Sequence, residues 1–176
     1  MIISVEELKT LVDIDETFSD SKLAMMLDGL EMLIRKKTNN HFHIKNVRFE
    51  MTVQDGQLVG SFDHLNVGDT IEVSASEYNH NAVACITAIS GSVITLNKAL
   101  QPEDGTIVIT KVVYPPDVIQ GVVNLMDYDI HNRDRVGVKS ESLSRHSVTY
   151  YDGGDQQYGY PSSLMDFITP YCKARF

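Results

Sequence analysis

Long apolar runs are missing from this sequence, and no stretch approaches the roughly 20 residues that cross a bilayer. Near its start the chain carries Glu6 and Glu7, where a secretion signal has a basic segment followed by an apolar run. We therefore expect a protein that stays in a cytoplasm, or in a particle assembled there. Hydrophobic residues make up 43% of the chain and charged residues 22%, which is typical of a folded globular protein.

Cysteine is scarce as well, with Cys85 and Cys172 in unlike surroundings. They form no CxxC pair and no other spacing typical of metal ligands. Cys85 lies in an apolar stretch, so we expect it in the core. Nothing in the sequence requires a disulfide bond.

An excess of basic residues is also absent, because the formal net charge is −9. A protein that grips nucleic acid usually carries a basic patch that neutralises phosphates. The one short basic run, residues 35–37, ends a predicted helix, and we interpret it as compensation of the helix dipole on a solvated face. The sequence therefore argues against a DNA clamp, although DNA can slide past an acidic surface without sticking.

Motifs of catalysis are missing too: there is no G-x-S-x-G, no P-loop and no G-x-G-x-x-G. His41 and His43 could place two imidazoles on one face of a strand, but a third ligand is not nearby unless Glu50 or His64 folds back. The ligand count and spacing do not match a zinc site, so we interpret the pair as a polar exit from a helix. We assign no catalytic residue, no metal ligand and no cofactor.

What the sequence does contain is helical periodicity at both ends. Ser4 and Glu7 form a capping box, which predicts a first helix. A second and longer helix begins at residues 19–21 and keeps apolar residues at helical spacing. A third helix opens after the two prolines at 115–116. A last short helix begins at Pro161, and Pro170 is expected to stop it.

Between the helices the apolar period changes from 3.6 to 2. Turn residues such as those at 55–56 and 90–92 separate short β-rich runs, which is typical of a small antiparallel barrel or sandwich. The predicted fold class is α+β: a helical core of about four helices with an inserted small antiparallel β-barrel. The expected segments are a helical core at 1–46 and 114–137, the barrel at 47–113, and a C-terminal arm with a short helix at 138–176.

Tyrosines gather near the end of the chain, where few other core-forming residues lie. Tyrosine is common at interfaces because its ring is apolar and its hydroxyl is polar. These rings either contact a partner or cover the helical core, and the sequence does not decide between the two. The residues are Tyr150, Tyr151, Tyr158, Tyr160 and Tyr171.

Both ends of the chain resemble phage head–tail connector (head-completion, or adaptor) proteins of the gp6-like and YqbG-like type. The opening block is ISVEELK at 3–9, an acidic connector and a helix that ends RKKTNNHF at 35–42. The closing block is VKSESLSRHSVTY at 138–150, a glycine-rich loop, GYPSSL at 159–164 and the terminal KARF. The segment 68–96 looks like the small SH3-like barrel of some of these proteins, although minimal members of the family are all-helical.

The resemblance implies a structural protein of the virion neck and not an enzyme. Such proteins form a twelvefold ring under the portal protein, extend the DNA channel, and offer a docking platform to the stopper or tail-completion protein. DNA would pass without sequence-specific binding, and no membrane is involved. The arm would then contact the portal or a neighbouring copy through Tyr150, Tyr151, Tyr160, Phe167, Arg175 and Phe176.

Three other interpretations remain open. The first is another phage neck or tail-completion protein. The second is a free SH3-like module that binds a peptide or nucleic acid; the aromatics at 47–113 are few for a stacking surface. The third is a hydrolase that uses His41, His43 or His146. No catalytic motif in the sequence supports this interpretation.

Overall fold

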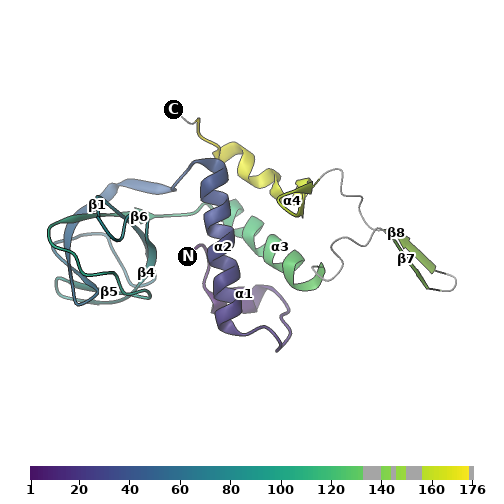
Figure 1. Ribbon diagram of the computed structural model, residues 1–176, viewed down its shortest axis with the longest axis horizontal. Helices are drawn as coiled ribbons and strands as arrows, with labels where there is room; N and C mark the ends of the chain where they lie inside the picture. The colour runs from purple at the N-terminus through teal and green to yellow at the C-terminus, as the bar shows by residue number, and fades with distance from the viewer. Residues whose placement is uncertain (133–139, 144–145, 150–155, 175–176) are drawn as a thin grey trace. The chain divides into compact units, whose positions relative to one another are not determined.

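The computed structural model describes residues 1–132, 140–143, 146–149 and 156–174 (Figure 1). Within these ranges the chain forms four α-helices, a 3₁₀ helix and antiparallel sheets. The predicted α+β class is therefore confirmed. By its contacts the chain divides into two units, which we call the barrel unit (Met1–Ile2 with Asn40–Tyr114) and the helical unit (Ile3–Asn39 with Pro115–Phe176).

The helical unit begins with two helices whose start signals are local. Helix α1 (Val5–Leu11) starts after Ser4, and Ser4 and Glu7 form the predicted capping box. Helix α2 (Asp20–Thr38) starts after Ser19, whose side chain accepts a hydrogen bond from the Lys22 backbone. At its end Asn39 adopts the left-handed conformation with φ 48°, which asparagine tolerates better than most residues.

The basic end of α2 differs from the prediction. Arg35 does not lie on a solvated face: it is 7% exposed, and its Nη1 lies 3.9 Å from Oε1 of the equally buried Glu31. The spacing of four residues places both side chains on the same side of the helix, which turns toward the core.

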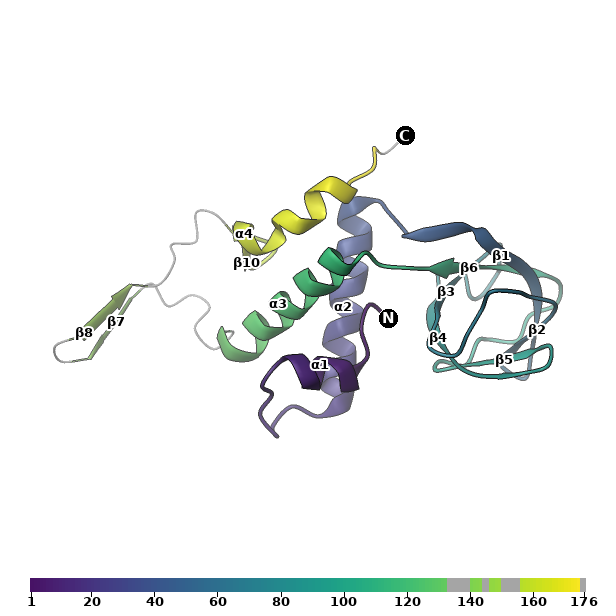
Figure 2. The same ribbon diagram turned by 180° about the vertical axis from the view of Figure 1, so that it is seen from behind.

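Three further elements complete the helical unit. They are α3 (Pro116–Asn132), α4 (Ser162–Met165) and the 3₁₀ helix η3 (Asp166–Tyr171). Both views show α3 beside α2, and α4 against α3 (Figure 2). Pro170 does not stop the last helix as expected but lies inside η3, one residue before its end, where its fixed φ suits a helical turn.

The barrel unit consists of six antiparallel strands. These are β1 (His43–Gln54), β2 (Gln57–Val59), β3 (Thr70–Ser74), β4 (Val83–Ser90), β5 (Val93–Leu96) and β6 (Ile107–Val112). They pair in the order β1-β2-β5-β4-β3-β6, and β6 pairs with β1, which closes the sheet as a barrel. Whether this barrel is SH3-like stays a prediction.

Local chemistry explains several features of the barrel. Asp55 and Gly56 have φ of 49° and 76°, which a tight hairpin between β1 and β2 requires. The interior holds alternate apolar residues of every strand, among them Met51, Ile71 and Ile109. Cys85 does not belong to this core: Ala84 and Ile86 on either side are buried, so Cys85 points the other way and is half-buried.

The two units differ in extent from the segments drawn from the sequence. The barrel unit starts at Asn40, whereas apolar alternation predicted residue 47, because β1 begins at His43 before its alternation does.

Two further hairpins pair β7 (Ser140–Leu143) with β8 (His146–Thr149) and β9 (Gln156–Gln157) with β10 (Tyr160–Pro161). No helix within the described ranges has both the length and the hydropathy to span a membrane.

Candidate functional site

A carboxylate is buried on the outer face of the barrel. In β3 the side chains of Ile71 and Val73 join the apolar interior, so Thr70 and Glu72 point to the opposite face. Glu72 is nevertheless only 2% exposed. Burying a carboxylate is costly unless it is paired, so the groups that cover Glu72 matter for this fold.

Two segments from distant parts of the sequence cover this face of β3. The amino group of Met1 lies 3.3 Å from Oγ1 of Thr70, and the Thr70 hydroxyl donates to the Met1 carbonyl at 3.0 Å. The segment that leads into β1 covers Glu72 with His41 and His43. Both contacts lie within the barrel unit.

Phe42 lies between the two histidines and has an unusual backbone conformation. Phe42 has a φ of 54°, an uncommon conformation for a residue with a side chain. Its ring is buried at 4.9 Å from the ring of Tyr114, and its carbonyl accepts a hydrogen bond from the Val113 N–H at 3.0 Å. With Phe42 held in this way, the flanking imidazoles lie together, with ring centroids 5.3 Å apart.

Both imidazoles contact the same carboxylate. Nδ1 of His41 lies 2.8 Å from Oε1 and 3.0 Å from Oε2 of Glu72, and Nε2 of His43 lies 2.7 Å from Oε2. The side chains of His41 and His43 are 45% and 33% exposed, whereas that of Glu72 is 2% exposed. The site therefore joins a buried carboxylate to two partly exposed imidazole side chains.

The sequence indicated only part of this arrangement. The pair of histidines was recognised, but it is not a mere polar exit from α2, because His43 is the first residue of β1. The third residue that joins them is neither Glu50, which is exposed, nor His64, whose Nε2 lies 3.4 Å from Asp63. Glu72 was missed because it is separated by 29 residues from His43 and sits in an ordinary alternating strand.

The predicted interface residues that the structure describes lie on the helical unit. Tyr160 is buried, and its hydroxyl donates to Oδ2 of Asp129 at 2.6 Å. Phe167 is half-buried, and its ring lies directly over Gly121 of α3. Their contact with a partner stays a prediction. The remaining residues assigned to the interface lie outside the described part of the chain: Tyr150, Tyr151, Arg175 and Phe176.

Hydrogen bonds hold the end of the chain on the helical unit. The Tyr171 hydroxyl lies 2.7 Å from both carboxylate oxygens of Asp117, and the Lys173 N–H donates to the Thr38 carbonyl at 2.7 Å. The hydrogen bond to Asp117 favours the neutral phenol and so raises the pKa of Tyr171 above 10.0. The closing segment is thus attached to both α2 and α3.

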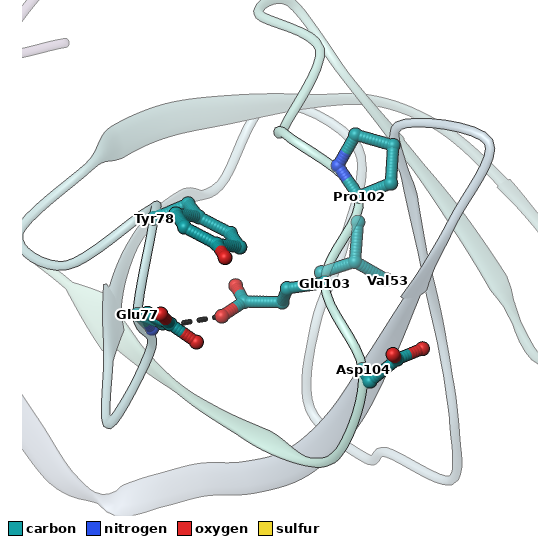
Figure 3. Close-up of a pocket in the computed structure, with 6 residues that line it drawn as sticks. All are labelled: Val53, Glu77, Tyr78, Pro102, Glu103 and Asp104. Carbon is teal, nitrogen blue, oxygen red and sulfur yellow. Dashed lines mark hydrogen bonds between the residues drawn. The ribbon is translucent and has the colours of Figure 1, made fainter.

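An open pocket on the barrel has a structural explanation. Its volume of about 310 Å³ is at the lower limit for small-molecule sites. Figure 3 shows the carboxylate of Glu103 directed at the backbone N–H of Glu77, which donates to it at 2.8 Å. Glu103 also accepts hydrogen bonds from Ser76 and Asn79, and these lower its pKa, the Ser76 bond most. The acid therefore holds the turn at 76–79.

No protein-family model matches the sequence, and no curated protein matches it either.

Proposed function

We propose that the chain is a structural head–tail connector of a tailed bacteriophage and not an enzyme. In this role it forms a ring below the portal protein, extends the DNA channel and offers a platform to the stopper and tail. The support is the resemblance of both chain ends to such proteins, together with one observation. The opening block up to Asn39 and the described parts of the closing block belong to the same helical unit, and the barrel lies between them in the sequence.

The hairpin in the closing block supports an arm that binds a partner. Strands β7 and β8 form a two-stranded sheet of their own, separate from the barrel and from β9–β10. An isolated two-stranded hairpin is at best marginally stable in water. Its two outer edges present backbone N–H and C=O groups that a further strand can pair with. The portal or a neighbouring copy would supply that strand, and the arm would order on binding.

The charge of the chain suits a channel through which DNA moves. A closed ring needs heterologous contacts, in which one face of a copy meets a different face of the next. Each copy of the chain in such a ring carries a net charge of −9. A lumen lined with part of this charge repels the phosphates and lets the duplex pass.

The alternative of a free SH3-like binding module finds less support. All residues from 47 to 113 are described, and their aromatics are Phe49, Phe62 and Tyr78. Phe49 and Phe62 are partly buried against the core, and Tyr78 is 57% exposed. One exposed ring is no platform on which successive bases or a proline-rich peptide can stack.

Pull-down and negative-stain imaging with the phage's own portal protein test the proposal. We expect a ring stacked on the portal. Removing residues 138–176 also deletes the packing of Tyr160 and Phe167, so a sharper variant replaces 138–150 with a Gly/Ser linker of equal length. That variant should keep its helical circular dichroism signal but should no longer bind the portal protein.

The outcomes separate the arm from the function. If the linker variant binds the portal as well as the wild type, the arm assignment is wrong and the connector proposal stands. If the wild type associates with neither the portal nor portal-bearing, DNA-filled capsids, the connector proposal fails. The chain would then be a protein of the tail side of the neck, or a free binding module.

A further inference from the structure

We propose that His41, His43 and Glu72 bind one divalent transition-metal ion of the zinc class on the outer face of the barrel. The proposal rests on the geometry of these three side chains and is independent of the connector function. Among the residues that the structure describes, they are the one group of three or more His, Cys, Asp or Glu side chains with ligand atoms close enough to share an ion.

The donor set is that of an open zinc-type site. Two imidazole nitrogens and a carboxylate are ligands that Zn²⁺ accepts, and three protein ligands leave a further position for water. The same set suits Co²⁺ and Ni²⁺, since imidazole and carboxylate ligands do not discriminate sharply among these ions. Hard ions such as Mg²⁺ prefer oxygen ligands throughout, so two imidazoles disfavour them.

The geometry needs only small adjustments to accept the ion. The ligand atoms of the three side chains all lie within 4.8 Å of one another. With metal–ligand bonds of about 2.1 Å, a tetrahedral site separates its ligand atoms by roughly 3.4 Å. The imidazole nitrogens now lie 2.8 Å and 2.7 Å from the carboxylate oxygens, so each of these contacts would open by roughly 0.6–0.7 Å. Any pair of ligand atoms nearer the 4.8 Å limit would close instead. Rotation of the two exposed rings provides this movement.

The backbone holds all three ligands in place before any ion binds. Glu72 pairs with Val83 of β4 and Thr110 of β6, so β3 is an internal strand of the barrel. His43 pairs with Val112 on the far side of β6 and reaches Glu72 across that strand. Since Glu72 and His43 sit on paired strands and His41 lies beside the anchored Phe42, little backbone conformational entropy is lost on binding.

Burial and exposure are distributed as a metal site requires. The carboxylate is shielded from water, which strengthens its attraction for a cation. The imidazoles are partly exposed, so an ion can enter from solvent and keep water in its remaining positions. The competing explanation is that the imidazoles serve only as hydrogen-bond partners of a buried acid, in which case no metal is needed.

Metal binding by the full chain, with any affinity tag removed, decides between these explanations. Equilibrium dialysis against micromolar Zn²⁺, followed by metal analysis, should find one ion per chain. Replacement by Co²⁺ should give visible d–d absorption of a nitrogen- and oxygen-ligated site. His41→Ala, at a side chain that is nearly half exposed, should weaken Zn²⁺ binding at least about tenfold, since even loss of an outer-shell partner has that effect.

Matched controls and a charge variant sharpen the test. His64→Ala and His80→Ala remove exposed histidines of the same unit and should leave the affinity unchanged. Glu72→Gln keeps the size of the side chain but not its charge, and should weaken binding too; if it fails to fold, His41→Ala still decides. The proposal is overturned if the wild type binds no stoichiometric Zn²⁺, or if His41→Ala and His64→Ala bind equally well.

Discussion

Two helical glycines of this protein should respond differently to the same substitution. A methyl group at Gly121 of α3 would lie 2.5 Å from Cδ1 and 2.6 Å from Cδ2 of Phe167. Ordinary carbon contacts are about 3.5–4.0 Å, so the ring must move. Gly29 of α2 is exposed, and a methyl group there would meet nothing within 4 Å.

The magnitudes follow from two effects. Replacing glycine by alanine inside a helix stabilises it by about 1 kcal/mol. Gly29→Ala should therefore raise the free energy of unfolding by about 1 kcal/mol. At Gly121 the same gain is opposed by overpacking, which costs about 1–3 kcal/mol. Because the helix effect is common to both variants, Gly121→Ala should be less stable than Gly29→Ala by about 1–3 kcal/mol.

Urea unfolding followed by circular dichroism at 222 nm measures this difference, since all the described helices belong to the helical unit. A double mutant isolates the cause. In a Phe167→Ala background the obstacle is gone, so Gly121→Ala should now stabilise by about 1 kcal/mol. If Gly121→Ala stabilises the wild-type chain as much as Gly29→Ala does, Phe167 does not lie where the structure places it.

Three further predictions concern the helical unit. Tyr160→Phe removes a hydrogen bond to a carboxylate and should lower the free energy of urea unfolding by about 1.5–3 kcal/mol. Ser4→Ala should cost about 1 kcal/mol. Ser4 lowers the pKa of Glu7, so the part of this gain that comes from the Glu7 carboxylate is present above pH 4.5 and is lost as the pH falls through the folded pKa. The Tyr171 bond to Asp117 stabilises below pH 10.0 and is lost as the pH rises through the raised pKa, and Asp117→Asn should lower that pKa in an NMR titration of the tyrosines.

The parts of the fold that sequence predicted are those decided by neighbours in the chain. The capping box at Ser4 and Glu7 and the turn at 55–56 are fixed by residues within four positions, so they could be predicted correctly. The burial of Arg35 and the approach of Phe167 to Gly121 depend on how helices pack, which no local pattern encodes. The same holds for Glu72, which lies in the predicted barrel segment 47–113 but whose neighbours on the outer face were not predicted.

The joining of the barrel's first and last residues has a consequence for folding. The Val113 N–H donates to the Phe42 carbonyl, so the chain enters and leaves the barrel at one place. Once the barrel has folded, α2 and α3 are therefore connected as if by a loop of a few residues. The entropy of closing that loop grows with the logarithm of its length, so the folded insertion costs the helical unit little. A barrel of this kind can be carried within a helical protein, or removed from it, without rebuilding the helices around it.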